Sequence, residues 1–199
     1  MGMTSNDLIT IVSGLPRSGT SMMMRMLEAG GLPALVDNVR GPDEDNPLGY
    51  YEFEPVKKTK DDASWLESAR GKAVKMVHLL LLDLPTDRPY RVILMQRNLD
   101  EVVRSQDVML KRQNKKGGEL TPGRIKQIFE AQLRQVRAHV HQHPNFRVLD
   151  VNYNEVIDNP TSAVRTVNEF LGGGLNPEAM LQVVDPALYR QRFGSESEG

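Results

Sequence analysis

The residues of this chain best suited to chemistry lie in a glycine-bearing turn. The turn reads Gly-Leu-Pro-Arg-Ser-Gly-Thr-Ser at positions 14–21, after an apolar run at 8–12 and before an amphipathic segment at 22–29. This order predicts a strand, a turn and a helix, and the N–H groups of such a turn bind phosphate or sulfate oxygens together with the positive end of the helix dipole. Three hydroxyl groups add hydrogen-bond donors, those of Ser18, Thr20 and Ser21. We therefore expect an anion site here.

The spacing of the turn is that of a P-loop with one change. Kinases and nucleotide triphosphatases use G-x-x-x-x-G-K-S/T, in which the lysine reaches the β- and γ-phosphates and the last hydroxyl holds Mg²⁺. Here Thr20 stands at the lysine position, and the cation of the loop is Arg17, three residues after Gly14. This change disfavours a P-loop kinase or nucleotide triphosphatase, the rival enzyme class, which would need Mg²⁺.

The stretch Pro-Arg-Ser-Gly-Thr-Ser resembles the 5′-phosphosulfate loop of the P-loop sulfotransferases, P-K/R-S-G-T-S/T. With arginine it is most similar to the tyrosylprotein branch and to many bacterial members. The resemblance implies a PAPS-dependent sulfotransferase, which moves a sulfuryl group from 3′-phosphoadenosine-5′-phosphosulfate (PAPS, a co-substrate) to a hydroxyl or amine without a metal. It also implies that five residues hold the phosphosulfate: Arg17, Ser18, Gly19, Thr20 and Ser21.

A second motif pairs Arg97 with Ser105, eight residues later. This Arg-x7-Ser spacing resembles the site at which the family binds the 3′-phosphate. Eight residues of helix rise roughly 12 Å, so both side chains can meet one phosphate only if the arginine folds back along the helix. Arginine offers a planar set of donors suited to phosphate, and the serine adds one more. The alternative is a surface arginine beside an ordinary helical serine.

The resemblance covers residues 8–190 and includes the segment 151–160, which is similar to the family's Tyr-Glu-Asp-Leu…Pro passage. One family feature is missing. Cytosolic members close over the adenine and the 3′-phosphate with a late Gly-x-x-Gly-x-Trp-Lys segment, whereas the only tryptophan here is Trp65. Arg190 and Arg192 are the candidates to replace that segment.

Transfer of a sulfuryl group builds negative charge on the leaving bisphosphate, which fixed donors must stabilise. We assign this role to Arg17 and the N–H groups of the loop. Lys75 resembles a family lysine that helps at the same oxygens, although a structural lysine with an exposed ammonium group is an equal alternative.

The acceptor must also lose a proton to a base. The tyrosylprotein branch uses a glutamate that follows the first helix, and on this resemblance Glu52 is the preferred base and Glu54 the second. Cytosolic members use a histidine two residues after the lysine. His78 lies three residues after Lys75, which in a strand places the two on opposite faces, so His78 ranks last.

The residues of these motifs can act together only if the fold brings them to one edge of a sheet. Short apolar runs separated by helical segments predict an α/β fold, in which a central parallel sheet of about four to five strands has helices on both faces. We expect one P-loop-type domain over residues 1–193 and a disordered tail at 194–199. The expected strands span 8–12, 73–80, 90–96 and 146–151. The expected helices span 22–29, 54–69, 99–112, 121–143, 160–171 and a segment from about 177.

Composition narrows the function further. The chain has 199 residues, a net charge of −1 and no cysteine, which excludes thiolate catalysis and gives no general attraction to nucleic acid. No long apolar segment predicts a membrane span, so we expect a cytoplasmic protein. We expect no metal: Asp83 is interpreted as a turn residue, and alternate histidines on a helix do not share a face. The histidines concerned are His139, His141 and His143.

The acceptor is not specified by the sequence and belongs to the small-molecule, carbohydrate, lipid or peptide class. By position, its pocket is expected to include an aromatic and acidic set, with the loop at 115–118 as a lid; the set is Asp43, Glu44, Asp45, Tyr50, Tyr51 and Phe53. A non-catalytic protein of the same fold that binds PAPS or its product, 3′,5′-bisphosphoadenosine (PAP), is the third functional alternative. The oligomeric state is open.

Overall fold

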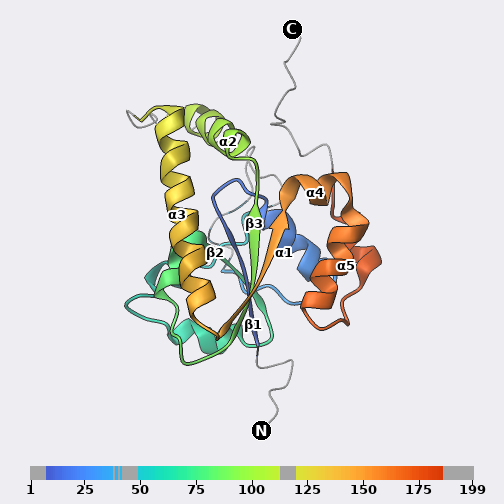
Figure 1. The fold of residues 1–199 in the computed structure, drawn as a ribbon. Helices are drawn as coiled ribbons and strands as arrows, with labels where there is room; N and C mark the ends of the chain where they lie inside the picture. Colours follow the sequence, from blue (N-terminus) through green and yellow to red (C-terminus); the bar gives the residue numbers. More distant parts are fainter. Residues whose placement is uncertain (1–7, 38, 40, 42–48, 113–119, 186–199) are drawn as a thin grey trace.

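A four-stranded, fully parallel sheet forms the centre of the molecule, with strand order β2-β1-β3-β4 (Figure 1). The computed structural model describes residues 8–37, 39, 41, 49–112 and 120–185. Within this part of the chain, no helix has both the length and the apolar character needed to cross a membrane.

The strands are β1 (Ile9–Gly14), β2 (Ala73–Val77), β3 (Tyr90–Gln96) and β4 (Phe146–Asn152). The α-helices are α1 (Thr20–Ala29), α2 (Leu99–Arg112), α3 (Pro122–Gln142), α4 (Tyr153–Asp158), α5 (Pro160–Phe170) and α6 (Pro177–Gln182). Three 3₁₀ helices complete the described elements: η2 (Glu54–Lys58), η3 (Ser64–Ala69) and η4 (His78–Asp83). The expected α/β class, with helices on both faces of a parallel sheet, is confirmed.

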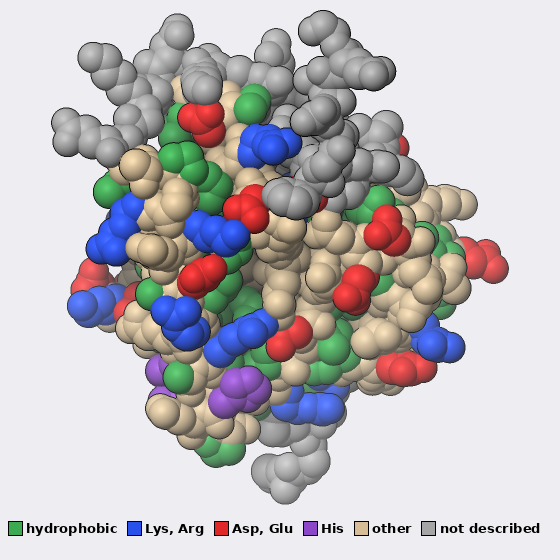
Figure 2. Space-filling view, turned by 45° about the horizontal axis from the view of Figure 1, so that its top comes forward, with side chains coloured by type: hydrophobic (Ala, Val, Ile, Leu, Met, Phe, Trp, Pro, Cys, Tyr) green, Lys and Arg blue, Asp and Glu red, His purple; other side chains and the backbone are tan. Residues whose placement is uncertain are grey.

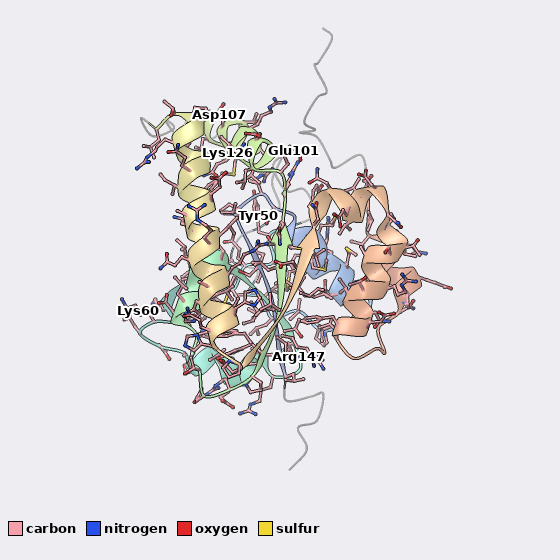
Figure 3. The ribbon with its side chains drawn as sticks, in the orientation of Figure 1. Tyr50, Lys60, Glu101, Asp107, Lys126 and Arg147 are labelled. Carbon is pink, nitrogen blue, oxygen red and sulfur yellow. The ribbon has the colours of Figure 1, made fainter. Side chains whose placement is uncertain are left out.

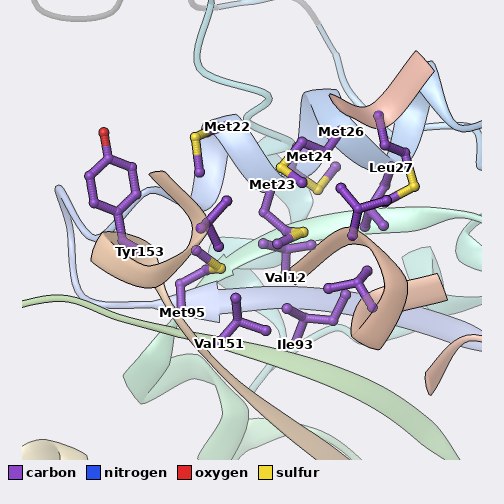
Figure 4. Packing of buried hydrophobic residues seen from close by; sticks show 14 of the residues in the cluster. Val12, Met22, Met23, Met24, Met26, Leu27, Ile93, Met95, Val151 and Tyr153 are labelled. Atoms are coloured by element: carbon purple, nitrogen blue, oxygen red, sulfur yellow. The ribbon is translucent and has the colours of Figure 1, made fainter. Parts of the chain in front are cut away.

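Two hydrophobic clusters cover the two faces of the sheet, because the inner strands carry apolar side chains toward both sides. On one face, α1 packs with α5 and α6; on the other, α3 packs with η3 and η4 (Figure 1). Four buried methionines of α1 belong to the first cluster together with Val12 and Ile93 (Figure 4). The unbranched thioether side chains fill this core.

The carboxyl ends of the strands place the motif residues side by side. In the register of the sheet, Gly14 lies opposite Val77 on one side and Met95 on the other, and Gln96 lies opposite Asn152. Neighbouring strand ends are therefore followed by the glycine-bearing loop after β1, by Arg97 and by the start of α4. Parallel α/β sheets bind ligands at this edge.

Two local expectations were wrong, and one helix was not expected. β2 ends at Val77 rather than at residue 80, because the chain turns there into η4. The segment 54–69 is two short 3₁₀ helices, since Asp62 accepts a hydrogen bond from the N–H of Ser64 and opens a turn between them. Helix α4 was not expected as a separate element. The side chain of Asn152 caps it by accepting hydrogen bonds from the N–H groups of Asn154 and Glu155.

Candidate active site

The loop between β1 and α1 has a left-handed backbone at two positions. Gly19 has φ 94° and Arg17 has φ 70°, and the left-handed region costs a residue with a Cβ about 1–2 kcal/mol. A Cβ on Gly19 would lie 2.3 Å from Cδ2 of Tyr153, the first residue of α4. The loop therefore requires glycine at this position both for its backbone and for the space that the tyrosine ring fills.

The base of the loop is held by its own hydroxyl group. Ser18 is buried, and both its hydroxyl and its N–H donate to the carbonyl of Leu15, at 2.7 and 3.2 Å. A Cβ on Gly14 would lie 2.5 Å from the Ser18 hydroxyl. The structure thus places the Ser18 side chain inside the loop, where it shapes the backbone.

Helix α1 begins immediately after Gly19, and its first turn is suited to a negative ligand. Gly19 caps the helix without any side-chain hydrogen bond, and the first turn contains no acidic residue. Thr20 and Ser21 are the first two residues of the helix and are both partly exposed. The positive end of the helix dipole therefore faces the loop without a carboxylate of that turn to neutralise it.

The two sequence motifs meet through Arg17. Its Nε donates to the hydroxyl of Ser105 at 2.9 Å, and its carbonyl accepts a hydrogen bond from Nη1 of Arg97 at 3.0 Å. Arg97 itself does not fold back onto Ser105: the serine contacts the loop arginine instead. The structure thus brings Arg17, Arg97 and Ser105 together at the carboxyl edge of the sheet.

Two residues next to Arg97 were missed by the sequence reasoning. Glu101 accepts from Nε of Arg97 at 2.9 Å, and the Arg97 guanidinium lies over the ring of Tyr153, 4.7 Å from its centroid. Burial raises the pKa of Tyr153, while the positive charge of Arg97 opposes this rise. The spacing of four residues gave no usable signal for this ion pair, because Arg97 precedes α2, which begins at Leu99, and the contact depends on how the chain enters that helix. The contact with Tyr153 needs the tertiary fold.

Lys75 lies on the face of the sheet that α1 covers. Its ammonium group donates to the carbonyl of Tyr50 and lies 3.4 Å from the hydroxyl of Ser21, which itself donates to the same carbonyl at 3.2 Å. Tyr50 is buried, and Figure 3 shows it beside the carboxyl ends of the strands. The structure therefore joins Lys75 to the end of the loop, where a cation could act on the ligand of the loop.

Tyr51 contacts the solvent-exposed side of α1 and so holds the segment that follows Tyr50 against this helix. Its hydroxyl donates to the carboxylate of Glu28, and burial, helped by this bond, raises the pKa of Tyr51 to about 12. Its φ of 55° is left-handed, which is unusual for a tyrosine. Two residues on, Phe53 packs edge-on against Trp65, with the ring centroids 6.2 Å apart. These contacts fix the segment that carries Glu52.

The two carboxylates considered as the base share one cation. Glu54 lies 2.5 Å and Glu52 3.8 Å from the ammonium group of Lys57. The side chain of Glu52 is the less exposed of the two, and its carbonyl accepts from the N–H of Asp37. Glu52 directly follows the anchored residue Tyr51, and Glu54 lies two residues further on.

His78 lies on the opposite side of the sheet from Lys75, although it belongs to η4 and not to the strand that the spacing argument assumed. Its ring is 2% exposed and its Nε2 lies 3.0 Å from Oε1 of Gln132 in α3. Burial lowers the pKa of His78, and the hydrogen bond to Gln132 partly offsets this effect. The residue two positions after Lys75 is Val77, which is 45% exposed and has no group that accepts a proton.

The structure also describes residues that were considered in connection with a metal. His139 and His143 share a face of α3 and their ring centroids are 4.3 Å apart, while Asp83 is the last residue of η4. Other predicted positions lie outside the described residues: Asp43, Glu44, Asp45, 115–118, Arg190, Arg192 and the tail at 194–199.

Comparison with known proteins gives the family. Similar solved structures include the sulfotransferase domain of the curacin biosynthetic pathway, at 17% identity and a TM-score of 0.54, covering 89% of this chain and 77% of that one. Mouse sulfotransferase SULT7A1 complexed with PAP is 18% identical, with a TM-score of 0.53 and coverage of 98% and 70%.

A third similar structure is retinol dehydratase in complex with androsterone and the inactive cofactor PAP, at 16% identity and a TM-score of 0.51, covering 92% of this chain and 64% of that one. At these identities the likeness concerns the fold. No curated protein gives a significant match. A family model described as "Sulfotransferase domain" matches residues 7–191, and the chain belongs to this family.

Proposed function

We propose that this chain transfers a sulfuryl group from PAPS to a hydroxyl or amine acceptor, without a metal. The observation that carries the proposal is the contact of Arg17 with both Ser105 and Arg97. It joins a loop suited to a 5′-phosphosulfate with the residues that resemble the family's 3′-phosphate site. A donor with anionic groups at both positions fits this arrangement, and PAP in the two similar structures supports it.

Within this proposal, the residues of the loop have different roles. Gly19, Thr20 and Ser21 form the start of α1 and bind the phosphosulfate through N–H and hydroxyl groups. Ser18 acts through the shape of the loop, because its hydroxyl is turned inward. Arg17 offers a planar charged group that stabilises the charge growing on the leaving bisphosphate. Lys75, beside Ser21, acts on the same oxygens.

The transfer step breaks one bond and forms one. The acceptor oxygen or nitrogen attacks the sulfur, the bond from sulfur to the bridging oxygen breaks, and the electron pair of that bond stays on the bisphosphate. Glu52 takes the proton of the acceptor, since Val77 offers no base near Lys75 and His78 lies on the other face. Glu54 is the second choice for this role, because it lies on the same anchored segment.

A kinase or nucleotide triphosphatase is the weaker candidate. Thr20 stands at the position of the P-loop lysine, and the Ser21 hydroxyl, which would hold Mg²⁺ in that class, donates to the carbonyl of Tyr50. Asp83, the other residue typical of a magnesium site, lies at the end of η4 and not at the end of a strand.

The experiment is a transfer assay with sulfur-labelled PAPS and a panel of phenolic, sugar, lipid and tyrosyl peptide acceptors, in EDTA and in Mg²⁺. We expect label to reach at least one acceptor at the same rate in both buffers. Phosphate transfer from ATP that requires Mg²⁺ would contradict the proposal. Binding of PAP without transfer of the labelled sulfuryl group to any acceptor would point instead to a non-catalytic protein of the same fold that binds PAPS or PAP.

A further inference from the structure

Glu101 is a buried acid that the proposed chemistry does not use. It lies in the first turn of α2, near the end of β3 (Figure 3), with a side chain that is 3% exposed. Burying a carboxylate costs several kcal/mol unless its charge and lone pairs are matched. A residue of this kind at the edge of a binding site needs an explanation.

The carboxylate is held from two sides. Its Oε2 accepts from Nε of Arg97 at 2.9 Å, and Nδ2 of Asn154 lies 3.3 and 3.4 Å from its two oxygens. The N–H of Glu101 is capped by the side chain of Asn98 at 3.4 Å. The acid thus links the start of α2 to α4, which begins at the end of the neighbouring strand.

The position of Arg97 depends on this acid. Its guanidinium has the Tyr153 ring on its face, the Arg17 carbonyl on Nη1 and Glu101 on Nε, and its side chain is 9% exposed. A free arginine side chain loses rotamer entropy when it binds a ligand, so a side chain that is already fixed binds a phosphate with a smaller entropic loss.

We propose that Glu101 is the positioning residue for Arg97 and thereby sets the preference of the site for a 3′-phosphorylated nucleotide. This inference rests on the proposed function. Glu101 has two opposing effects: its charge repels a phosphate, and its bond to Nε aims the arginine. The geometry favours the second effect, because the carboxylate is buried between Arg97 and Asn154 rather than turned toward the solvent.

The neighbouring acid provides a matched control. Asp100 precedes Glu101 on the same helix, but its side chain is 44% exposed and contacts Lys126 at 2.8 Å. Replacing Asp100 by Asn removes the same charge from the same turn without touching Arg97. A general effect of charge on anion binding would therefore appear in both variants.

The experiment measures the affinity of the native chain and of four variants for PAP and for 5′-AMP, which lacks the 3′-phosphate. The variants are Glu101→Gln, Glu101→Asp, Asp100→Asn and Asn154→Ala. We expect Glu101→Gln to weaken PAP binding about tenfold or more, the value of a charged hydrogen bond, and to leave 5′-AMP binding unchanged. Glu101→Asp restores part of the PAP affinity, and Asp100→Asn alters neither ligand. Asn154→Ala tests the same support without removing the acid, and we expect it to lower PAP affinity to a smaller extent.

Unchanged or tighter PAP binding by Glu101→Gln would overturn the inference. An equal loss for PAP and 5′-AMP would also overturn it, because a purely structural role moves both. If Glu101→Gln does not fold, unchanged PAP binding by Asn154→Ala and Glu101→Asp has the same meaning. A native chain that does not prefer PAP over 5′-AMP would contradict the proposed function itself, and the inference with it.

Discussion

Arg17 and Ser105 lie 88 positions apart in the sequence and share a hydrogen bond of 2.9 Å between Nε and the hydroxyl. The bond crosses from the loop after β1 to the middle of α2, which follows the adjacent strand β3. It gives the loop arginine, with its left-handed backbone, a fixed direction. The groups expected to meet the two ends of one nucleotide are thereby tied to each other before any ligand binds.

The first prediction separates these two residues. We expect Arg17→Ala to lower kcat by about 10²–10³ or more, because it removes a donor that acts on the leaving group. Ser105→Ala keeps the arginine, so we expect a higher KM for PAPS and a nearly unchanged kcat. Steady-state kinetics of both variants decides; equal losses of kcat would contradict the separate roles.

Local signals explain which parts of the fold could be predicted. Strand β3 and helix α2 match their expected bounds, 90–96 and 99–112, because an apolar run and a one-sided apolar face are each complete within their own segment. The end of β2 was not predictable, since the apolar run continues through Leu82 and a buried 3₁₀ helix needs the same composition as a buried strand.

The second prediction tests the base. We expect Glu52→Gln to lower kcat about 10²–10⁴-fold, the usual contribution of a general base, with PAP affinity unchanged. Glu54→Gln is the matched control, because this carboxylate contacts the same Lys57. If Glu54→Gln shows the larger loss, Glu54 is the base; full activity in both variants would contradict the role of this segment.

The third prediction concerns the shape of the loop. Gly19 and Gly31 have similar backbones, with φ 94° and 102°, but a Cβ at Gly31 meets no atom within 4 Å. We expect Gly19→Ala to lower the free energy of unfolding by about 1–3 kcal/mol more than Gly31→Ala, because only the former collides with Tyr153. Urea unfolding measures both values, and equal losses would mean that the ring of Tyr153 moves aside without cost.

The fourth prediction follows from the lowered pKa of His78. Its ordinary value is 6.5, and burial lowers it in the folded state, so the unfolded chain binds the proton more readily. Stability is therefore unaffected above pH 6.5 and falls as the pH drops below this value toward the pKa of the folded state. The slope cannot exceed about 1.4 kcal/mol per pH unit for one proton.

We expect His78→Gln to unfold with a shallower dependence on pH between about 7.5 and 5 than the native chain. Part of the slope remains, because burial also lowers the pKa of His139. His141→Gln is the control, since His141 is exposed. An unchanged slope in His78→Gln would show that the ring is protonated equally easily in both states.

Motif spacing predicted which residues would gather at the site but not their contacts. Arg17 and Arg97 follow the neighbouring strands β1 and β3, and Lys75 lies within β2 on the other side of β1, so the parallel sheet brings them to one region. Whether Ser105 meets Arg97 or Arg17 depends on how α2 leaves the sheet, which no local pattern encodes. Glu101 was overlooked for a related reason: its burial depends on Asn154, 53 positions away.

The measurement that tests the central claim most directly is calorimetric titration of the native chain and of Arg97→Ala with PAP, and with ATP in the presence and absence of Mg²⁺. We expect micromolar binding of PAP that does not depend on the metal, weakened in Arg97→Ala by about 1.5–3 kcal/mol for each charged hydrogen bond that the substitution removes. Preference for ATP with Mg²⁺, or PAP binding that Arg97→Ala leaves unchanged, would contradict the assignment of this edge of the sheet as a PAPS site.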